Sequence, residues 1–115
     1  MKRDFELIRC ILFEIEGKNE NPGGWIDLEL KGWPADLISY HVWLLHEAGL
    51  IEAHEATTKD GYEWKPKTIR WEGHEFLDAA RNDKAWKKAM ERIKKLPGSV
   101  SFAVLLGLLK IQYNI

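Results

Sequence analysis

Lysine and arginine side chains gather in two segments of the chain, where they could neutralise phosphate groups. One segment surrounds a predicted tight turn at Asp60-Gly61, and the other begins a lysine-rich predicted helix. These residues are Lys59, Lys65, Lys67, Arg70, Lys84, Lys87 and Lys88. Each phosphate that a cation neutralises adds affinity that depends on salt and not on base sequence. The alternative interpretation is that both segments are ordinary solvated surfaces.

A different chemistry is concentrated on one predicted helix, which carries carboxylates, a hydroxyl and aromatic rings at positions expected to face outward. These positions are Asp36, Ser39, Tyr40, Trp43 and Glu47. Tyr40 and Trp43 lie three residues apart and therefore share a helix face. Exposed tyrosine and tryptophan are frequent anchors of protein–protein contacts. We predict a partner-binding surface here, unless Trp43 folds back onto the neighbouring hairpin as core.

No catalytic or metal-binding pattern is recognisable in the sequence. His41 and His46 are five residues apart, so they lie on different helix faces, whereas the zinc-protease spacing is four with a glutamate between. We expect His41 to be a hydrogen-bonded core histidine and Cys10 to be a packing residue. The sequence contains neither a phosphate-binding loop nor a nucleophile elbow. The prediction is a protein that is not an enzyme and uses no metal and no cofactor.

Length and charge bound the kind of protein. The 115 residues suffice for one domain with one core. The net charge is −1, but residues 1–58 carry a charge of −6 and residues 59–115 carry +5. A basic half of this kind can attract phosphate or an acidic protein. The single cysteine favours the reducing cytoplasm, and the most apolar run, Phe102 to Leu109, is too short to span a membrane.

The spacing of apolar residues predicts the elements that position these side chains. Steps of three and four predict helices, and alternation of apolar with polar residues predicts strands. In chain order we expect helix 3–16, strand 26–30, helix 34–48, strands 50–57 and 62–69, helix 71–81, a helix capped by Asp83, and a last helix capped by Ser99 or Ser101. Asp4 or one of its neighbours should cap the first helix, Gly49 should end the second, and Pro66 should lie at a sheet edge or bulge.

The last predicted helix is apolar on nearly all sides, which is typical of a helix buried on more than one side. Its expected contact residues are Phe102, Leu105, Leu106 and Leu109. A second copy of the chain could cover them and form a two-fold homodimer. Alternatively, this helix is the central core helix of the monomer.

One stretch of the chain resembles the helix-to-wing passage of ArsR-type and related winged-helix regulators. It runs Ser39-Tyr-His-Val-Trp-Leu-Leu-His-Glu-Ala-Gly-Leu-Ile51, and its end matches their Leu-x-x-Ala-Gly-Leu-Ile pattern. Residues 69–77 resemble the strand-to-helix exit after the wing. The whole chain is similar to a family of short uncharacterised proteins that is common in phages and prophages. The resemblance implies an α+β fold, with a winged helix-turn-helix over 1–80 and a packed helical C-terminal extension over 81–115.

The sequence departs from the winged-helix regulators where these would read DNA. From Pro34 to Gly49 it has no lysine and no arginine, although base edges and phosphates require donors. Arg70 stands where relatives often place threonine, so a hydroxyl cap is lost. The leading hypothesis is therefore a regulator-like protein that binds duplex DNA through the hairpin and the basic helix. The alternative is an accessory protein or inhibitor of a host defence complex, which uses its acidic, aromatic helix face to bind a host protein.

Overall fold

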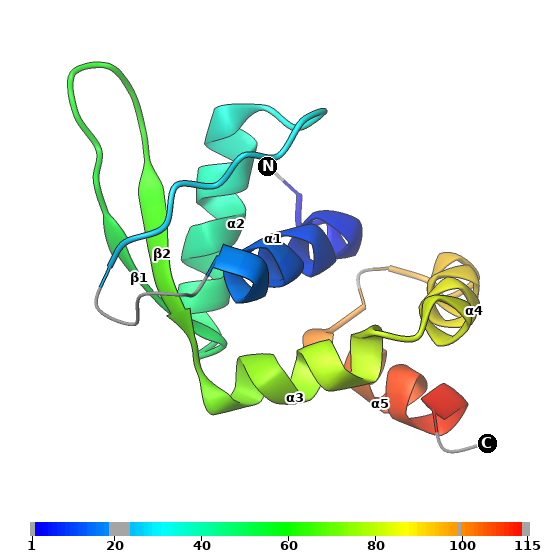
Figure 1. Ribbon diagram of the computed structural model, residues 1–115. Coiled ribbons are helices and arrows are strands. Elements are labelled where there is room, and N and C mark those ends of the chain that lie inside the picture. The colour runs from blue at the N-terminus through cyan, green and yellow to red at the C-terminus, as the bar shows by residue number, and fades with distance from the viewer. Residues whose placement is uncertain (1, 19–23, 99, 114–115) are drawn as a thin grey trace. The chain divides into compact units, whose positions relative to one another are not determined.

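The computed structural model describes residues 2–18, 24–98 and 100–113, and it gives residues 111–113 as helix backbone only. This part of the chain forms a mixed α+β structure, as predicted, with five helices and one two-stranded antiparallel sheet (Figure 1). The elements are α1 (Phe5–Lys18), α2 (Ala35–Glu47), β1 (Ile51–Glu55), β2 (Trp64–Ile69), α3 (Trp71–Ala80), α4 (Asp83–Lys94) and α5 (Phe102–Tyr113).

The chain divides into two compact units, Met1–His74 and Glu75–Ile115, and the division falls inside α3. The predicted extension begins later, at residue 81. Within the described residues, no helix is long and apolar enough to cross a membrane.

Helix α1 begins where the sequence predicts its cap. The Asp4 carboxylate accepts hydrogen bonds from the backbone N–H groups of Glu6 (2.9 Å) and Leu7 (3.3 Å). This satisfies two of the donors that a helix start leaves free. The buried face is formed by Leu7, Ile8, Ile11, Leu12 and Ile15. These side chains form the centre of the first unit.

Helix α2 passes into the sheet through a single glycine. Gly49 has a φ of 78°, a left-handed conformation that residues with a Cβ adopt at a cost. The Leu50 N–H then donates to the Leu45 carbonyl at 2.9 Å, and the Leu50 carbonyl accepts from the Arg70 N–H at 2.9 Å. Strand β1 therefore starts directly after the helix, as Ala48-Gly49-Leu50 predicts.

The two strands form a hairpin with one irregularity. Ile51 pairs with Ile69 and Ala53 pairs with Pro66, so Lys67 is an extra residue in β2 and forms a bulge. Pro66 thus lies beside a bulge, as predicted. The strands are shorter than the predicted ranges, and an isolated bridge between Thr58 and Gly61 closes the turn beyond them.

The predicted strand over 26–30 is wrong. The residues alternate in burial, with Ile26 buried and Asp27 exposed, but the sheet has only β1 and β2 in the described part of the chain. The segment is an extended stretch that donates one backbone hydrogen bond, from Ile26 to the Pro66 carbonyl at 2.8 Å. Burial alternates along any extended segment that is covered on one side, and this pattern does not require backbone hydrogen bonds to a neighbouring strand.

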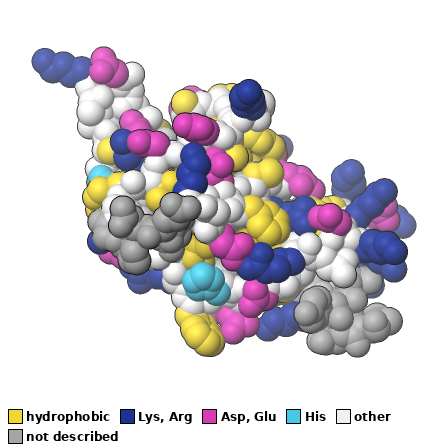
Figure 2. Space-filling view, in the orientation of Figure 1, with side chains coloured by type: hydrophobic (Ala, Val, Ile, Leu, Met, Phe, Trp, Pro, Cys, Tyr) yellow, Lys and Arg dark blue, Asp and Glu magenta, His cyan; other side chains and the backbone are white. Residues whose placement is uncertain are grey.

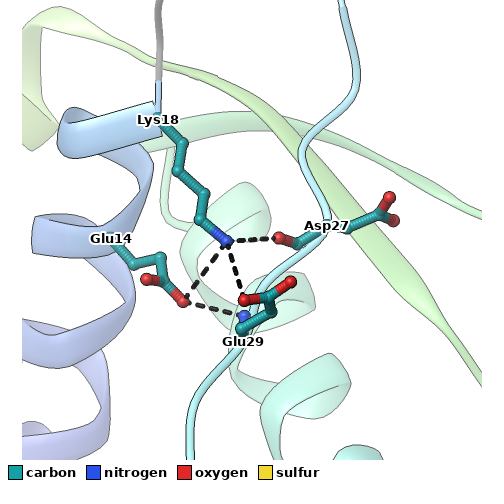
Figure 3. Close-up of polar contacts among 4 residues, drawn as sticks. All are labelled: Glu14, Lys18, Asp27 and Glu29. Atoms are coloured by element: carbon teal, nitrogen blue, oxygen red, sulfur yellow. Dashed lines mark hydrogen bonds and ion pairs between the residues drawn. The ribbon is translucent and has the colours of Figure 1, made fainter.

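Polar contacts with α1 hold the other side of this extended segment. The Lys18 ammonium donates to the Asp27 carbonyl at 3.0 Å and lies 3.9 to 4.0 Å from the carboxylates of Glu29 and Glu14 (Figure 3). The Glu29 backbone N–H donates to the Glu14 carboxylate at 2.8 Å. These side chains take the place of the strand partners that the segment lacks.

His41 is a core histidine, which confirms its interpretation from the sequence. Its side chain is fully buried. The Nε2 atom accepts from the Asp4 backbone N–H at 2.8 Å, and the Nδ1 atom lies 2.9 Å from the Leu37 carbonyl oxygen. This pair of partners assigns the proton to Nδ1. The ring therefore joins the start of α1 to α2.

The second unit is built around Phe76, in the C-terminal half of α3. Its ring centroid lies 6.1 Å from that of Trp86 in α4 and 4.7 Å from that of Phe102 in α5. Helix α4 is capped by Asn82, whose side chain accepts from the Ala85 N–H at 3.0 Å. The prediction of Asp83 as the cap is wrong by one residue, because Asp83 already belongs to the helix.

The remaining helix starts in the second half of the chain agree in part with the predictions. Ser101 caps α5 through a hydrogen bond from the Val104 N–H at 3.2 Å, and Ser99, the other predicted cap, lies outside the described residues. Helix α3 starts at Trp71, directly after Arg70.

Helices α1 and α2 are not joined by a short turn. In a helix-turn-helix, a turn of three or four residues joins the two helices. Here residues 19–34 separate α1 from α2, and their described part, 24–34, contains no helix. The structure shows α2 followed by a hairpin and α3, and the winged helix-turn-helix over 1–80 stays a prediction.

Gly73 should be intolerant of any side chain. A Cβ at this position would meet the Leu50 carbonyl oxygen and would lie 2.6 Å from Cγ2 of Ile69. We expect Gly73→Ala to lower the free energy of unfolding by about 1–3 kcal/mol in urea titration, because backbone must move. The control is Gly17→Ala in α1, where a Cβ meets nothing within 4 Å. Equal stability of the two variants would contradict this packing.

Replacement of His41 should destabilise the first unit. His41→Leu leaves the Asp4 N–H without its acceptor, and an unsatisfied buried donor costs about 1–3 kcal/mol. The matched control is His46→Leu on the same helix, because Nδ1 of His46 is buried and has no hydrogen-bond partner among the described residues. Thermal unfolding should show the larger loss for His41→Leu. A larger loss for the His46 variant would argue against the bridging role.

Candidate interaction surfaces

Four of the five predicted partner-binding residues form one stripe along α2. Asp36, Tyr40, Trp43 and Glu47 are spaced by four, three and four residues, so they share one face. Asp36 and Glu47 are exposed, whereas Tyr40 and Trp43 are half-buried. The two aromatic rings lie 5.9 Å apart. We call these four residues the α2 stripe, and it presents two carboxylates around an aromatic pair.

Ser39, the fifth predicted residue, is nearly buried and lies off the α2 stripe, among the residues that line the groove described below. Only 5% of it is exposed. One helical residue turns by about 100°, which places Ser39 on the side of α2 that faces the hairpin. His46 lies on this side too, with its ring 5.6 Å from that of Trp64 in β2. The sequence suggested exposure because serine is polar, but the hairpin covers this side of the helix.

Tyr62, at the base of the hairpin turn, belongs to the same region and was missed as a surface residue. Its side chain is 42% exposed. Burial raises the pKa of its phenol, and the nearby Glu55 carboxylate and Tyr40 phenol raise it further. Tyr62 and residues from the first turns of α2 line one common groove. The alternation of Tyr62 and Trp64 was the available signal.

A groove of about 320 Å³ lies beside the α2 stripe. Three segments line it: the extended stretch at 26–28, the first turns of α2, and the hairpin from Thr58 to Pro66. Its charged lining residues are Asp27, Asp60, Glu63 and Lys65. The formal charge of this lining is −2, and the aromatic residues Tyr62 and Trp64 are among the lining residues. Such a groove does not suit a phosphate.

Lys65, a predicted phosphate contact, is engaged within the protein. Its ammonium lies 2.9 Å from the Asp27 carboxylate and 3.7 Å from that of Glu63. The hydrogen bond and the charge of Asp27 raise the pKa of Lys65, and Lys65 lowers the pKa of Asp27 in return. A phosphate would have to compete with both carboxylates for this ammonium.

The other predicted basic residues of the hairpin differ in their surroundings. The Lys67 ammonium lies 5.2 Å from the centre of the Trp25 ring, within the range of a cation–π contact. Trp25 in turn packs against His54, with ring centroids 3.5 Å apart. Lys59 and Arg70 are exposed. The hairpin therefore brings together fewer available cations than the sequence predicts.

The strongest concentration of positive charge is on α4. Lys84, Lys87 and Lys88 are exposed, as expected, and three further exposed cations extend the set: Arg92, Lys94 and Lys95. We call these six residues the α4 basic face. Figure 2 shows dark-blue side chains crowded over this helix. No carboxylate among the described residues forms an ion pair with them.

The opposite side of α4 carries its packing residues, Ala85, Trp86 and Ala89, which are buried. The helix is therefore held by one face and presents its charge on the other. Glu91 is the exposed carboxylate within the charged side. A partner that covers the α4 basic face would have to be anionic, because it must compensate the positive charges.

Two of the four predicted dimer-contact residues point inward. Leu105 and Leu109 are fully buried within the chain, so a second copy could not reach them. Phe102 and Leu106 are half-buried, and the more exposed apolar residues of α5 are Ala103 and Val104. The side of α5 that we predicted to contact a second copy is thus partly buried in the interior of the chain itself. The homodimer itself stays a prediction.

Cys10 has the surroundings of a packing residue. It is a free, half-buried thiol in α1. Burial raises the pKa of the thiol, and the nearby Glu6 carboxylate raises it further against the opposing effect of Arg9. A thiol with a raised pKa is a poor nucleophile at neutral pH.

Comparison with known proteins places the chain in a family. The model of the family described as "Hypothetical protein (DUF2513)" matches residues 2–100. The chain belongs to this family. An uncharacterised protein of Haemophilus influenzae is 37% identical to this DUF2513 chain over 94 residues, which are 82% of the chain and 80% of that protein. No solved structure matches significantly.

The matched range shows which surfaces fall within the DUF2513 family region. It includes the α2 stripe, the groove and the α4 basic face, and it ends before α5 begins at Phe102. The first four helices and the hairpin therefore lie in the part of the chain that the family model matches.

Proposed function

We propose that this DUF2513 protein is a non-enzymatic binding protein of the cytoplasm that contacts the phosphates of duplex DNA through the α4 basic face. The observation that carries the proposal is the set of six exposed cations on and just after one short helix. Lysine and arginine at such a density attract the phosphate backbone independently of base sequence. Buried residues on the opposite side hold the helix, so the charges are displayed on a fixed support.

The proposal includes a winged-helix type of first unit and a phage- or prophage-type regulator role. Its support is the direct passage of α2 into an antiparallel hairpin, followed at once by α3. Exposed Lys59 and Arg70 would add phosphate contacts at the hairpin. The α2 stripe carries Asp36 and Glu47 where a recognition helix needs donors, so base reading by α2 is not part of the proposal.

Affinity for duplex DNA should depend steeply on salt. If four cations of the α4 basic face each neutralise one phosphate, raising the salt from ~50 to ~200 mM should weaken binding roughly 100-fold. The double variant Lys84→Gln/Lys88→Gln should lower the slope of log affinity against log salt by about two, equally for unrelated DNA sequences. Fluorescence anisotropy with a labelled duplex measures both effects.

The matched control removes the same charge elsewhere. Lys2 and Lys31 are exposed and lie outside α4, so Lys2→Gln/Lys31→Gln should leave the salt slope unchanged. Absence of binding at ~50 mM salt would refute the proposal, since even non-specific phosphate contacts are detectable there. An equal decrease of the salt slope in both double variants would show that binding depends on the net charge of the protein and not on the α4 basic face.

A second candidate function is recognition of a host protein, as an accessory factor or an inhibitor of a defence complex. The specific observation is the α2 stripe, in which two exposed carboxylates flank an aromatic pair that is half accessible. Aromatic residues of this kind often contribute a large share of binding energy at protein interfaces. Its acidic character would suit a basic surface on the partner.

Substitution of the stripe should abolish partner capture. We expect the wild-type protein to recover one defined partner from bacterial lysate, and Tyr40→Ala/Trp43→Ala to lose it, as read by quantitative mass spectrometry. Asp36→Asn/Glu47→Gln leaves the half-buried rings in place and should also weaken recovery. The control is Trp71→Ala, which removes a 75% exposed ring from α3. Equal recovery with all variants would refute the second candidate.

A further inference from the structure

We propose that the groove between α2 and the hairpin receives a basic side chain, an arginine or lysine of a partner protein. This inference rests on the second candidate function and specifies the chemistry of the partner. The groove is described by its three lining segments: the stretch 26–28, the start of α2 and the hairpin from Thr58 to Pro66. All three belong to the first unit.

The charges of the groove favour a cation. Carboxylates reach it from two separate segments, Asp27 from the extended stretch and Asp60 and Glu63 from the hairpin. Lys65 is the basic residue among the described lining, which leaves a charge of −2. Two uncompensated carboxylates attract a guanidinium or ammonium and repel a phosphate at the same place. Duplex DNA is therefore the less suitable occupant.

The protein already shows that these carboxylates can hold an ammonium group. Lys65 Nζ lies between the Asp27 and Glu63 carboxylates, at 2.9 and 3.7 Å. Asp60, in contrast, is exposed at the turn and its carboxylate has no ion-pair partner among the described residues. An incoming cation would find Asp60 available and would compete with Lys65 for the other two carboxylates.

The aromatic wall supplies the second half of the site. Tyr62 and Trp64 line the groove, and Tyr62 is 42% exposed. A guanidinium over an aromatic face gains cation–π attraction, and its flat shape allows stacking as well. Ser39, which directly precedes Tyr40 of the α2 stripe in the chain, also lines the groove. A partner that lies on the α2 stripe could therefore place one of its basic side chains in the groove.

The test uses the full chain labelled with ¹⁵N and a short peptide, acetyl-Gly-Arg-Gly-amide, as the probe. Backbone amides of Gly61 and Tyr62 and the indole N–H of Trp64 should shift in a saturable manner, with a dissociation constant in the millimolar range expected for one side chain, ~1 mM. The matched peptide with citrulline, which has the same shape and no charge, should cause no saturable shift.

Variants in the groove should move the affinity in opposite directions. Asp60→Asn should weaken binding of the arginine peptide about two- to fivefold, the size expected for an exposed ion pair. Lys65→Met removes the internal competitor and should tighten binding by a similar factor. The control Glu72→Gln neutralises an exposed carboxylate on α3, outside the groove, and should leave the affinity unchanged. An unchanged proton spectrum outside the groove shows that each variant is folded.

Several results would overturn the inference. These are equal shifts with the citrulline peptide, shifts spread over surfaces other than the groove, no saturable shift, or weaker binding by Lys65→Met. A phosphate-rich duplex that shifts the groove residues would also contradict it. If lysate capture depends on the α2 stripe while the arginine peptide fails, the groove alone is refuted. If capture of a partner from lysate does not depend on the α2 stripe, the second candidate function is refuted, regardless of the result with the peptide.

Discussion

The backbone of Leu50 is the point on which the first unit depends. Its N–H closes the end of α2 on Leu45, and its carbonyl accepts from Arg70 at the end of β2. Gly73 of α3 packs against the same carbonyl so closely that a Cβ would collide with it. Helix α2, the hairpin and α3 therefore all contact this one residue. The groove follows from this, because α2 and the hairpin both line it.

Local signals predicted this junction because each of its parts is encoded by a residue with few alternatives. Gly49 provides a left-handed end that other residues adopt at a cost, and Asp4 provides an acceptor for free helix donors. The burial of His41 could likewise be inferred from its position on an apolar face. Sequence reasoning was reliable where a residue type fixes the local backbone, as at Gly49, although it placed the α4 cap one residue late, at Asp83 instead of Asn82.

The errors at residues 26–30, Ser39, Leu105 and Leu109 have a common physical origin in tertiary contacts. Alternation in 26–30 was correct as burial, but hydrogen-bond partners in a sheet depend on which strands arrive beside it, and here the side chains of α1 take that role. Ser39 is polar yet covered by the hairpin, and Leu105 and Leu109 are taken up by the chain's own interior. Nothing in the local sequence specifies which of two apolar or polar faces a neighbour will cover.

Charge shows the same limit. The sequence locates the acidic and basic halves correctly, but it does not reveal that Lys65 is held by Asp27 and Glu63 or that Lys67 rests on Trp25. These contacts remove cations from the hairpin and leave α4 as the helix with accessible positive charge. The candidate surfaces therefore differ in sign: the α2 stripe and the groove are acidic, and the α4 basic face is positive.

Mapping of a bound DNA duplex by amide chemical shifts tests this separation most directly. With the full ¹⁵N-labelled chain and a duplex at low salt, the account predicts shifts for amides from Lys84 to Lys95 that disappear as salt is raised. It also predicts that Asp36 to Glu47 and the groove residues stay unchanged. Salt-sensitive shifts centred on α2, with α4 unaffected, would contradict the account.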